Sequence, residues 1–329
     1  MQEYLSFNVS VEHVEAANAS DTAFIVIRTT IYAFLTTLLV LGNAFVLFIV
    51  SRRQCDSACS SATKLFLVSL TIADLNSGVF IAFPMFITSA ANRWILGSFM
   101  CSVTAFTRVF FNIGSLMSAL AITLDRFVAV TRPLRYIIIM TRRQACVWLS
   151  VIWVVALFSA FMYGPILGRP AAYFHDYTAC FFTEKDPDVV DKSVAVCISI
   201  FVILPLIATT IIYARLACIA RKHVKNIAKI QAAAKEKASN TKYLETFMLI
   251  SVGFALTWIP YATVQLIEMA YSEIALPQYL YLFICSLLLA NNGINLFIYY
   301  GRNEKFKQTA RKVVCNSLKS RSRIASSTT

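Results

Sequence analysis

The sequence predicts an all-α membrane protein, a bundle of seven transmembrane helices followed by a short amphipathic eighth helix. Three observations predict this fold class. Of the 329 residues, 58% are hydrophobic and only 14% are charged, whereas about a quarter of the residues of a soluble domain are charged. Seven segments are long and apolar enough to cross the roughly 30 Å of hydrocarbon in a bilayer. Lysine and arginine gather in every second link between those segments, which is typical of membrane proteins.

The apolar segments form one membrane domain, 25–300, because the links between them are too short to hold a second domain. The segments lie at 25–50, 64–89, 99–131, 143–166, 193–220, 244–271 and 278–300. The basic links follow the first, third and fifth segments, and the tail is also basic. The positive-inside rule therefore predicts a multi-pass plasma membrane protein with an extracellular N-terminus and a cytoplasmic C-terminus.

The two ends of the chain differ in character. The leader, 1–24, is acidic and contains two N-glycosylation sequons, at Asn8 and Asn18, as an extracellular terminus does. After the last span, 301–314 alternates apolar and basic residues, which predicts an amphipathic helix on the inner leaflet. Cys315 follows it, either as a palmitoylation site or as an unmodified thiol. The tail, 315–329, is rich in Ser, Arg and Thr and is predicted to be disordered.

Several function classes are disfavoured by the composition. The net charge is +13, but the basic residues are interleaved with the spans, so nucleic-acid binding is not indicated. No zinc-type cysteine pairs and no phosphate-binding or hydrolase motifs occur. A membrane enzyme would need clustered histidines or paired acids within the spans, and Asp74 and Asp125 are too far apart along their helices to cooperate. The sequence therefore predicts no enzymatic activity.

A polar stripe runs along the third span. Residues three or four apart share one face of a helix. The stripe consists of Arg108, Asn112, Ser115, Ala119, Ile122 and Arg126. It lies inside an otherwise apolar segment, so lipid is not its expected surrounding, and it predicts the inward face of a central helix.

Each span also carries a characteristic residue or motif. In chain order these are Gly42-Asn43, Leu70-Thr71-Ile72-Ala73-Asp74, Trp94 before Cys101, Asp125-Arg126-Phe127 with Pro133, Trp153, Pro205 with Tyr213, Phe254 with Trp258 and Pro260, Asn295 with Tyr299, and finally Phe306. Taken together, they resemble the rhodopsin-like (class A) G-protein-coupled receptors over nearly the whole chain. The resemblance implies an extracellular ligand and a heterotrimeric G protein as partners, with arrestin, receptor kinases and membrane lipids beside them.

The resemblance also implies roles for the switch residues. The residues for coupling and switching are Asp125, Arg126, Tyr213, Phe254, Pro260, Asn295 and Tyr299. In the family, the Arg126 equivalent pairs with its neighbouring Asp at rest and contacts the G protein when the sixth helix swings outward. Pro260 is the expected hinge, because a proline within a helix removes a hydrogen bond and kinks the chain.

Asp74 lies in the middle of its span, where a carboxylate without partners is costly. The resemblance implies a Na⁺ site around it, and the alternative is a hydrogen-bonded network without an ion. Its expected members are Asp74, Ser115, Asn291, Asn292 and Asn295, with Asn43 nearby. No other cofactor is expected. The predicted topology also places Cys101 and Cys180 outside, where the compartment is oxidising, so we expect them to form a disulfide.

The motifs do not name the ligand. Arg108 stands where amine receptors have an Asp, and Leu289 where opsins have the chromophore-binding Lys, so neither a typical amine receptor nor an opsin is expected. The expected pocket residues are Arg108, Val109, Asn112, Trp258, Tyr261, Ala262, Gln265 and Glu268. Arg108 calls for an anion, either an acidic group on a small molecule, lipid or peptide ligand, or Glu268 within the chain.

Two departures bear on signalling. Leu296 replaces the usual Pro after Asn295, and Asn240 stands where many relatives have an acid that holds the Arg126 equivalent. The second departure supports an alternative, a receptor of this class that is constitutively active. A seven-helix transporter is a further alternative, but it would predict internal repeats or paired broken spans, and neither is visible.

Overall fold

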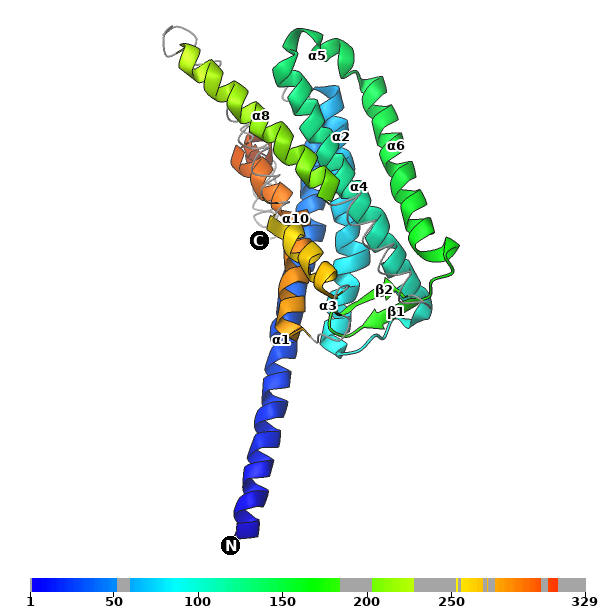
Figure 1. The fold of residues 1–329 in the computed structure, drawn as a ribbon, viewed down its shortest axis with the longest axis vertical. Helices are drawn as coiled ribbons and strands as arrows, with labels where there is room; N and C mark the ends of the chain where they lie inside the picture. Colours follow the sequence, from blue (N-terminus) through cyan, green and yellow to red (C-terminus); the bar gives the residue numbers. More distant parts are fainter. Residues whose placement is uncertain are drawn as a thin grey trace, which may run out of the picture.

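The computed structural model describes residues 2–51, 60–183, 203–227, 253, 256–268, 271, 276–302 and 307–312. These residues form a bundle of long helices that run side by side, with a small β-hairpin at one end (Figure 1). We call this the hairpin end, and the opposite end, where Arg126 lies, the Arg126 end.

The first half of the chain supplies the centre of the bundle. Its elements are α1 (Gln2–Val50), α2 (Ser61–Ser77), the π-helical segment η2 (Gly78–Ala82), α3 (Phe83–Ala91), α4 (Gly97–Thr131) and α5 (Pro133–Ile139). Helix α4 packs against α2, α6 (Arg142–Phe161) and α8 (Leu204–Ile227) and also touches the hairpin. The polar stripe predicted in the third span therefore lies on the central helix.

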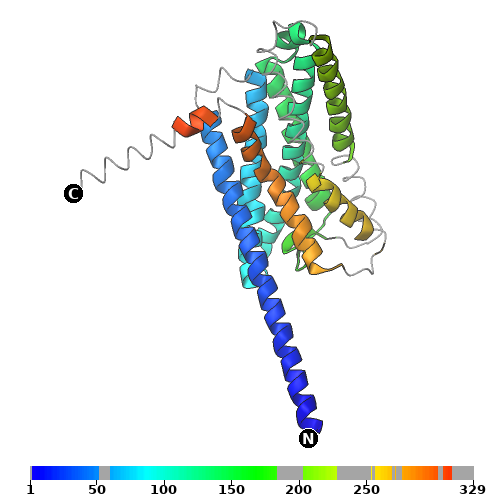
Figure 2. The same ribbon diagram turned by 90° about the vertical axis from the view of Figure 1, so that its left-hand side faces the viewer.

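The second half of the chain supplies two helices and a hairpin that pack on α4, and a helix that packs on α1. Its elements are α6 (Arg142–Phe161), the π-helical segment η3 (Met162–Ile166), β1 (Ala171–Phe174), β2 (Ala179–Phe182), α8 (Leu204–Ile227) and α10 (Gln278–Arg302). Residues 256–268 and 307–312 are also helical. Helix α10 packs against α1 (Figure 2).

Five described helices are long and apolar enough to cross a membrane, and they agree with the predicted spans. They cover Asp21–Val50, Ser61–Ala91, Gly97–Thr131, Arg142–Ile166 and Gln278–Phe297. The predicted fifth and sixth spans fall only partly within the described residues, as α8 and the helix 256–268. The prediction of an all-α membrane bundle is confirmed, and the hairpin is an addition to it.

A wide turn interrupts the second span. Segment η2 has π-helical hydrogen bonding and joins α2 to α3 without a loop. Pro84 lies two residues after this segment. Proline has no backbone N–H to donate, and its ring would clash with the carbonyl four residues earlier in a regular α-helix. These two effects account for the wider turn. Gly78, in the same segment, lies so close to α1 that a Cβ there would be 2.9 Å from Leu39 Cβ.

The hairpin is fixed to the central helix by a disulfide. Strands β1 and β2 are antiparallel, and Tyr173 lies opposite Cys180. Cys180 is bonded to Cys101 near the start of α4, with their Cα atoms 5.4 Å apart. The predicted disulfide is confirmed.

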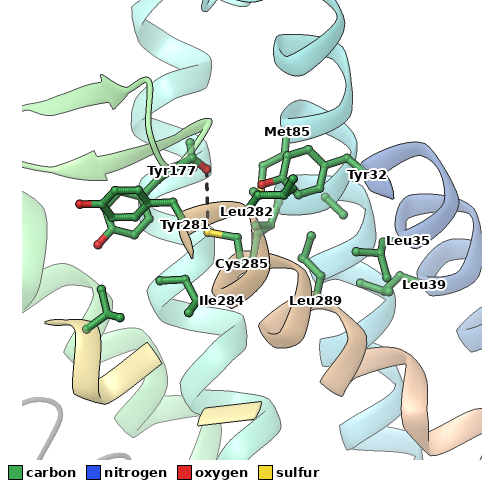
Figure 3. Packing of buried hydrophobic residues seen from close by; sticks show 14 residues of the cluster. Tyr32, Leu35, Leu39, Met85, Tyr177, Tyr281, Leu282, Ile284, Cys285 and Leu289 are labelled. Atoms are coloured by element: carbon green, nitrogen blue, oxygen red, sulfur yellow. Dashed lines mark hydrogen bonds between the residues drawn. The ribbon is translucent and has the colours of Figure 1, made fainter. Parts of the chain in front are cut away.

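The hydrophobic core divides into two main clusters. One lies toward the Arg126 end and includes Phe66, Leu70 and Leu216. The other lies beneath the hairpin, where Tyr177 of the hairpin meets Tyr32, Met85 and Cys285 from three helices (Figure 3). The second cluster includes Tyr177 and Tyr281, which bind Glu268 as the next section describes.

Candidate functional site

A buried carboxylate organises the Arg126 end. Asp125 is 0% exposed and accepts hydrogen bonds from Arg126 Nη2 at 2.6 Å, Thr63 Oγ1 at 2.7 Å and the Tyr136 hydroxyl at 2.7 Å. Arg126 Nε adds a bond of 3.0 Å, and Arg126 also contacts the Thr63 hydroxyl. These partners compensate the free-energy cost of burying the Asp125 carboxylate.

The network also reaches the start of α2. Ser60 Oγ accepts a hydrogen bond from the Thr63 amide and so caps this helix, and it lies 2.6 Å from the Tyr136 hydroxyl. Burial raises the pKa of the Tyr136 hydroxyl and the nearby Asp125 carboxylate adds to the effect, so Tyr136 stays a neutral donor. One hydroxyl therefore ties α5 to both α2 and α4.

Asp74 lies fully buried in the middle of the bundle. Its two oxygens accept hydrogen bonds from Ser115 Oγ and Asn295 Nδ2, both at 2.8 Å. Asn43 instead bonds the backbone carbonyls of Leu39 and Asn292. The side chains of Asn291 and Asn292 are buried but make no hydrogen bond to Asp74, so three of the expected residues meet here and two do not contact the carboxylate.

A further oxygen faces the same region. Ser77 lies one turn after Asp74 on α2, and its hydroxyl is buried without a hydrogen bond. Carboxylate and hydroxyl oxygens are the donors that a hard cation such as Na⁺ prefers. The donor set of Asp74, Ser115 and Ser77 fits such an ion, and sequence reasoning missed Ser77.

Arg108 lies beneath the hairpin. Its guanidinium stands over the Phe181 ring at 4.7 Å, and Nη2 lies 3.7 Å from Met85 Sδ. Its Nε is buried and makes no hydrogen bond within the part of the chain that the structure describes. No carboxylate of the described residues lies within ion-pair distance of it. A guanidinium in these surroundings is a strong attractor for an anion.

Glu268 is engaged elsewhere. Its Oε2 accepts hydrogen bonds from the Tyr177 hydroxyl at 2.5 Å and from Gln265 Nε2 at 3.0 Å, and its Oε1 accepts one from the Tyr281 hydroxyl at 2.6 Å. The Tyr177 and Tyr281 rings also pack edge to face at 4.6 Å (Figure 3). Burial and the bond to Glu268 both raise the pKa of Tyr177, which keeps it protonated. We call Glu268, Tyr177, Tyr281 and Gln265 the Glu268 clamp.

The remaining expected pocket residues lie between these two groups. Trp258 and Tyr261 pack edge to face at 6.2 Å, and Trp258 touches Leu116 of α4 through an apolar cluster that includes Ala262. Val109 and Asn112 are half-buried, and the Asn112 amide makes no hydrogen bond within the described residues. Tyr261 is close enough to interact electrostatically with both Arg108 and Glu268. Trp258 and Ala262 therefore pack on α4 through Leu116, and Tyr261 lies near both Arg108 and Glu268.

Some of the predicted site residues, or their side chains, lie outside the part of the chain that the structure describes. The side chains of Tyr213 and Tyr299 are not described, and Phe254, Asn240 and Cys315 lie outside the described residues, as do the side chains of Asn8 and Asn18. Pro260 lies within the helix 256–268, and α10 continues as a helix through Leu296.

Several site residues were missed by sequence reasoning. They are Met85, Tyr177, Phe181, Tyr281 and Cys285. Two of them had a signal, because Tyr281 and Cys285 lie one turn apart on the face of α10 that also carries Leu289. The hairpin residues had none beyond their closeness to Cys180.

Comparison with known proteins agrees with the geometry. The family model described as 7 transmembrane receptor (rhodopsin family) matches residues 42–299. Galanin receptor type 1 of Homo sapiens is 28% identical over 295 residues, covering 87% of this chain and 81% of that protein. Melatonin receptor type 1A of Mus musculus is 27% identical over 304 residues, covering 90% and 80%. The GQ-coupled rhodopsin of Mizuhopecten yessoensis is 26% identical over 240 residues, covering 69% and 47%. The matched stretch contains the Asp125–Arg126 pair, the Asp74 centre and the surface beneath the hairpin, and the chain belongs to the rhodopsin family of seven-transmembrane receptors, which are not enzymes.

Proposed function

We propose that this receptor recognises an extracellular ligand through an acidic group held by Arg108 and passes the signal to a heterotrimeric G protein at Arg126. One observation carries the ligand class. The Arg108 guanidinium has a thioether sulfur and an aromatic ring as neighbours and no carboxylate among the described residues. A charge in such a setting is stabilised most by an anion that arrives with the ligand.

The main competitor for Arg108 is occupied. Glu268 accepts three hydrogen bonds from neutral donors, and those bonds satisfy both of its oxygens. To reach Arg108, Glu268 would have to leave Tyr177 and Tyr281. This favours the ligand over an internal ion pair as the source of the anion.

The relatives do not decide the ligand, because they are receptors of different kinds. Receptors named for galanin and for melatonin and a rhodopsin match at nearly the same identity. The residues of this chain must therefore guide the choice. Arg108 in place of an acid disfavours an ordinary amine, and Leu289 in place of a Lys disfavours a covalent chromophore.

The orientation in the membrane is part of the proposal. Arg132, Arg135, Arg142 and Arg143 follow α4 and lie at the Arg126 end, and the positive-inside rule assigns the side with the basic links and the tail to the cytoplasm. The hairpin end then faces outward, where the Cys101–Cys180 disulfide is stable. On this orientation the leader 1–24 is glycosylated at Asn8 and Asn18, the helix 301–314 lies on the inner leaflet, Cys315 is palmitoylated, and arrestin and receptor kinases act on the cytoplasmic side.

A Na⁺ ion is proposed as an allosteric cofactor at Asp74. Asp74, Ser115 and Ser77 would hold it, and Asn295 would turn its amide away from the carboxylate. The ion supplies a positive charge that balances the buried carboxylate. The alternative is the ion-free network of hydrogen bonds described above.

The experiment that tests the ligand class compares acids with their neutral counterparts. Cells that express the receptor are exposed to a panel of carboxylic acids, phosphate esters and acidic peptides, each paired with its methyl ester or amide, and several G proteins are read out. We expect activity only from acids, with loss of at least tenfold in potency for Arg108→Gln. Unchanged potency of every active compound on Arg108→Gln would remove Arg108 from recognition.

Matched controls separate recognition from coupling. Arg126→Ala must abolish signalling by all compounds while binding persists. Signalling without any ligand, at matched surface expression and sensitive to Arg126→Ala, would instead favour the constitutively active alternative.

A further inference from the structure

A second arginine lies buried at the hairpin end, and the ligand site described so far does not use it. Arg28 belongs to α1 and is only 3% exposed. Its Nε donates a hydrogen bond to Ser89 Oγ at 3.0 Å, and its Nη2 donates one to Asn92 Oδ1 at 2.8 Å. Its guanidinium also lies 5.6 Å from the Phe24 ring centroid. The side chain is therefore held between α1 and the end of α3.

All of these partners are neutral. No carboxylate of the described residues lies within ion-pair distance of Arg28. The nearest acid on its own helix, Asp21, is two turns away and exposed, and Asp176 at the hairpin turn is exposed as well. Burying a cation without a counter-charge is costly even when hydrogen bonds are made. Tethering α1 to α3 would not by itself require a charged group.

Arg28 and Arg108 lie on the same side of the bundle. Tyr32 stands one turn after Arg28, and both guanidinium groups are close enough to act on its hydroxyl. Tyr32 packs beside Met85, whose sulfur contacts Arg108 (Figure 3). A continuous path of side chains thus joins the two cations through α1, α3 and α4.

Four buried hydroxyl groups at this end of the bundle make no hydrogen bond within the described residues. They are the hydroxyls of Tyr32, Thr88, Thr104 and Tyr173. Thr88 lies on α3 next to Ser89, and Thr104 lies one turn before Arg108 on α4. A buried hydroxyl without a partner costs free energy of its own. Two cations and four such hydroxyls supply donors in excess, which an anion with several oxygens would satisfy.

We propose that Arg28 is a second anion-binding residue and that the ligand is a diacid, with one acidic group at Arg108 and the other directed toward Arg28. The inference rests on the proposed function in one respect, since it assumes that Arg108 holds the first acidic group. The class of ligand is a small linear or branched molecule with two carboxylate or phosphate groups, rather than a monoacid such as a fatty acid.

The test uses the purified full-length receptor in detergent micelles and measures its melting temperature. The probes are a chain-length series of linear dicarboxylates and the monocarboxylates of equal length, at equal ionic strength. A ligand that binds the folded state raises the melting temperature in proportion to its occupancy. We expect one range of dicarboxylate lengths to bind at least tenfold more tightly than the matching monocarboxylates.

Variants assign that preference to a residue. Arg28→Gln should remove the tenfold preference for the diacid, which corresponds to about 1.4 kcal/mol of binding free energy. The affinity for monocarboxylates should stay within about twofold of that of the unmodified receptor. Arg108→Gln should weaken both classes. Arg93→Gln removes an exposed arginine from the same end and should change neither. Should Arg28→Gln fail to fold, Arg28→Met keeps the length and packing of the side chain and is judged by the same criterion.

The outcomes separate the two proposals. Equal binding of diacids and monoacids to the unmodified receptor overturns the role of Arg28 and leaves that of Arg108 intact. Equal losses for both classes on Arg28→Gln or Arg28→Met assign Arg28 to structure alone and also overturn it. If no acid of either class binds, the proposed function fails together with this inference.

Discussion

The Tyr177 hydroxyl donates a hydrogen bond of 2.5 Å to Glu268, which ties the hairpin to the helix 256–268 directly above the expected pocket. Tyr281 donates to the same carboxylate from α10. The hairpin, the helix 256–268 and α10 therefore meet at one carboxylate. Any outward movement of the helix 256–268 at this end must break or carry along these bonds.

Removing a donor from the Glu268 clamp should loosen it. A hydrogen bond to a charged group contributes about 1.5–3 kcal/mol, so Tyr281→Phe should lower the melting temperature of the purified receptor by several degrees. Tyr279→Phe is the control, because Tyr279 lies on the same helix but is 70% exposed. Equal melting temperatures for the two variants would show that the clamp does not stabilise the fold.

Tyr136→Phe should weaken the hold on Asp125 and Arg126. The variant loses the bonds to Asp125 and Ser60 and keeps the ring. We expect ligand-free G-protein activation to rise several-fold at matched surface expression, because Arg126 is held by a carboxylate that has lost one of its partners. Tyr271→Phe changes an exposed tyrosine and serves as control. Basal activity equal to that of the control would contradict this role for Tyr136.

The contribution of Tyr136 should also depend on pH in a defined way. Burial is the main cause that raises the pKa of this hydroxyl above its ordinary 10.0, so the folded state favours the neutral donor. The stabilisation is then complete below pH 10.0 and is lost only as the pH rises through the higher folded value. The difference in melting temperature between the unmodified receptor and Tyr136→Phe should stay constant from neutral pH to about pH 9. A difference that shrinks within that interval would mean that another group titrates.

Sodium should stabilise the receptor through Asp74 and Ser77. We expect NaCl to raise the melting temperature relative to choline chloride at equal ionic strength, and Asp74→Asn to abolish that effect. Ser77→Ala should weaken it several-fold, because the variant removes one oxygen donor. Ser102→Ala is the control, since this exposed hydroxyl bonds only a carbonyl of its own helix. A sodium effect that survives in Asp74→Asn would place the ion elsewhere.

Gly78→Ala should disturb the contact between α1 and η2. The new Cβ would lie 2.9 Å from Leu39 Cβ and 3.3 Å from the Val40 backbone nitrogen, and neither atom is the end of a flexible side chain. Overpacking of this kind costs about 1–3 kcal/mol, so melting temperature and surface expression should both fall. Gly253→Ala is the matched change, because its nearest neighbour would be 3.8 Å away. Comparable behaviour of the two variants would argue against the close approach.

The sequence predicted the parts of the site that depend on helical periodicity. Asp125 and Arg126 are adjacent in the chain, and Ser115 lies on the predicted inward stripe, so their places followed from α4 alone. The group of asparagines shows the limit of this reasoning. Asn291, Asn292 and Asn295 lie within about 100° of one another around α10, so periodicity allowed all three to face Asp74. In the described structure only Asn295 bonds that carboxylate.

The partner of Glu268 was beyond the reach of periodicity. The sequence left Glu268 and an acidic group on a ligand as the alternative partners of Arg108, whereas the structure binds Glu268 to Tyr177, Tyr281 and Gln265. Tyr177 lies in a hairpin whose position is set by the Cys101–Cys180 disulfide and by its packing on three helices. Such tertiary placement leaves no local pattern in the chain. The buried position of Arg28 was missed for the same reason, since a lone arginine near the end of a span resembles one that reaches the membrane surface.

The π-helical turn at Gly78–Ala82 changes how related receptors should be aligned with this one. A wide turn accommodates one more residue than a regular helix, so every residue after it is rotated by about 100° relative to a continuous α-helix. Met85 and Ser89 follow that turn, and both are buried. A relative that lacks the wide turn would need a single-residue gap within the span for its pocket residues to match. An ungapped alignment would pair the arginine-contacting positions of this receptor with lipid-facing positions of the other.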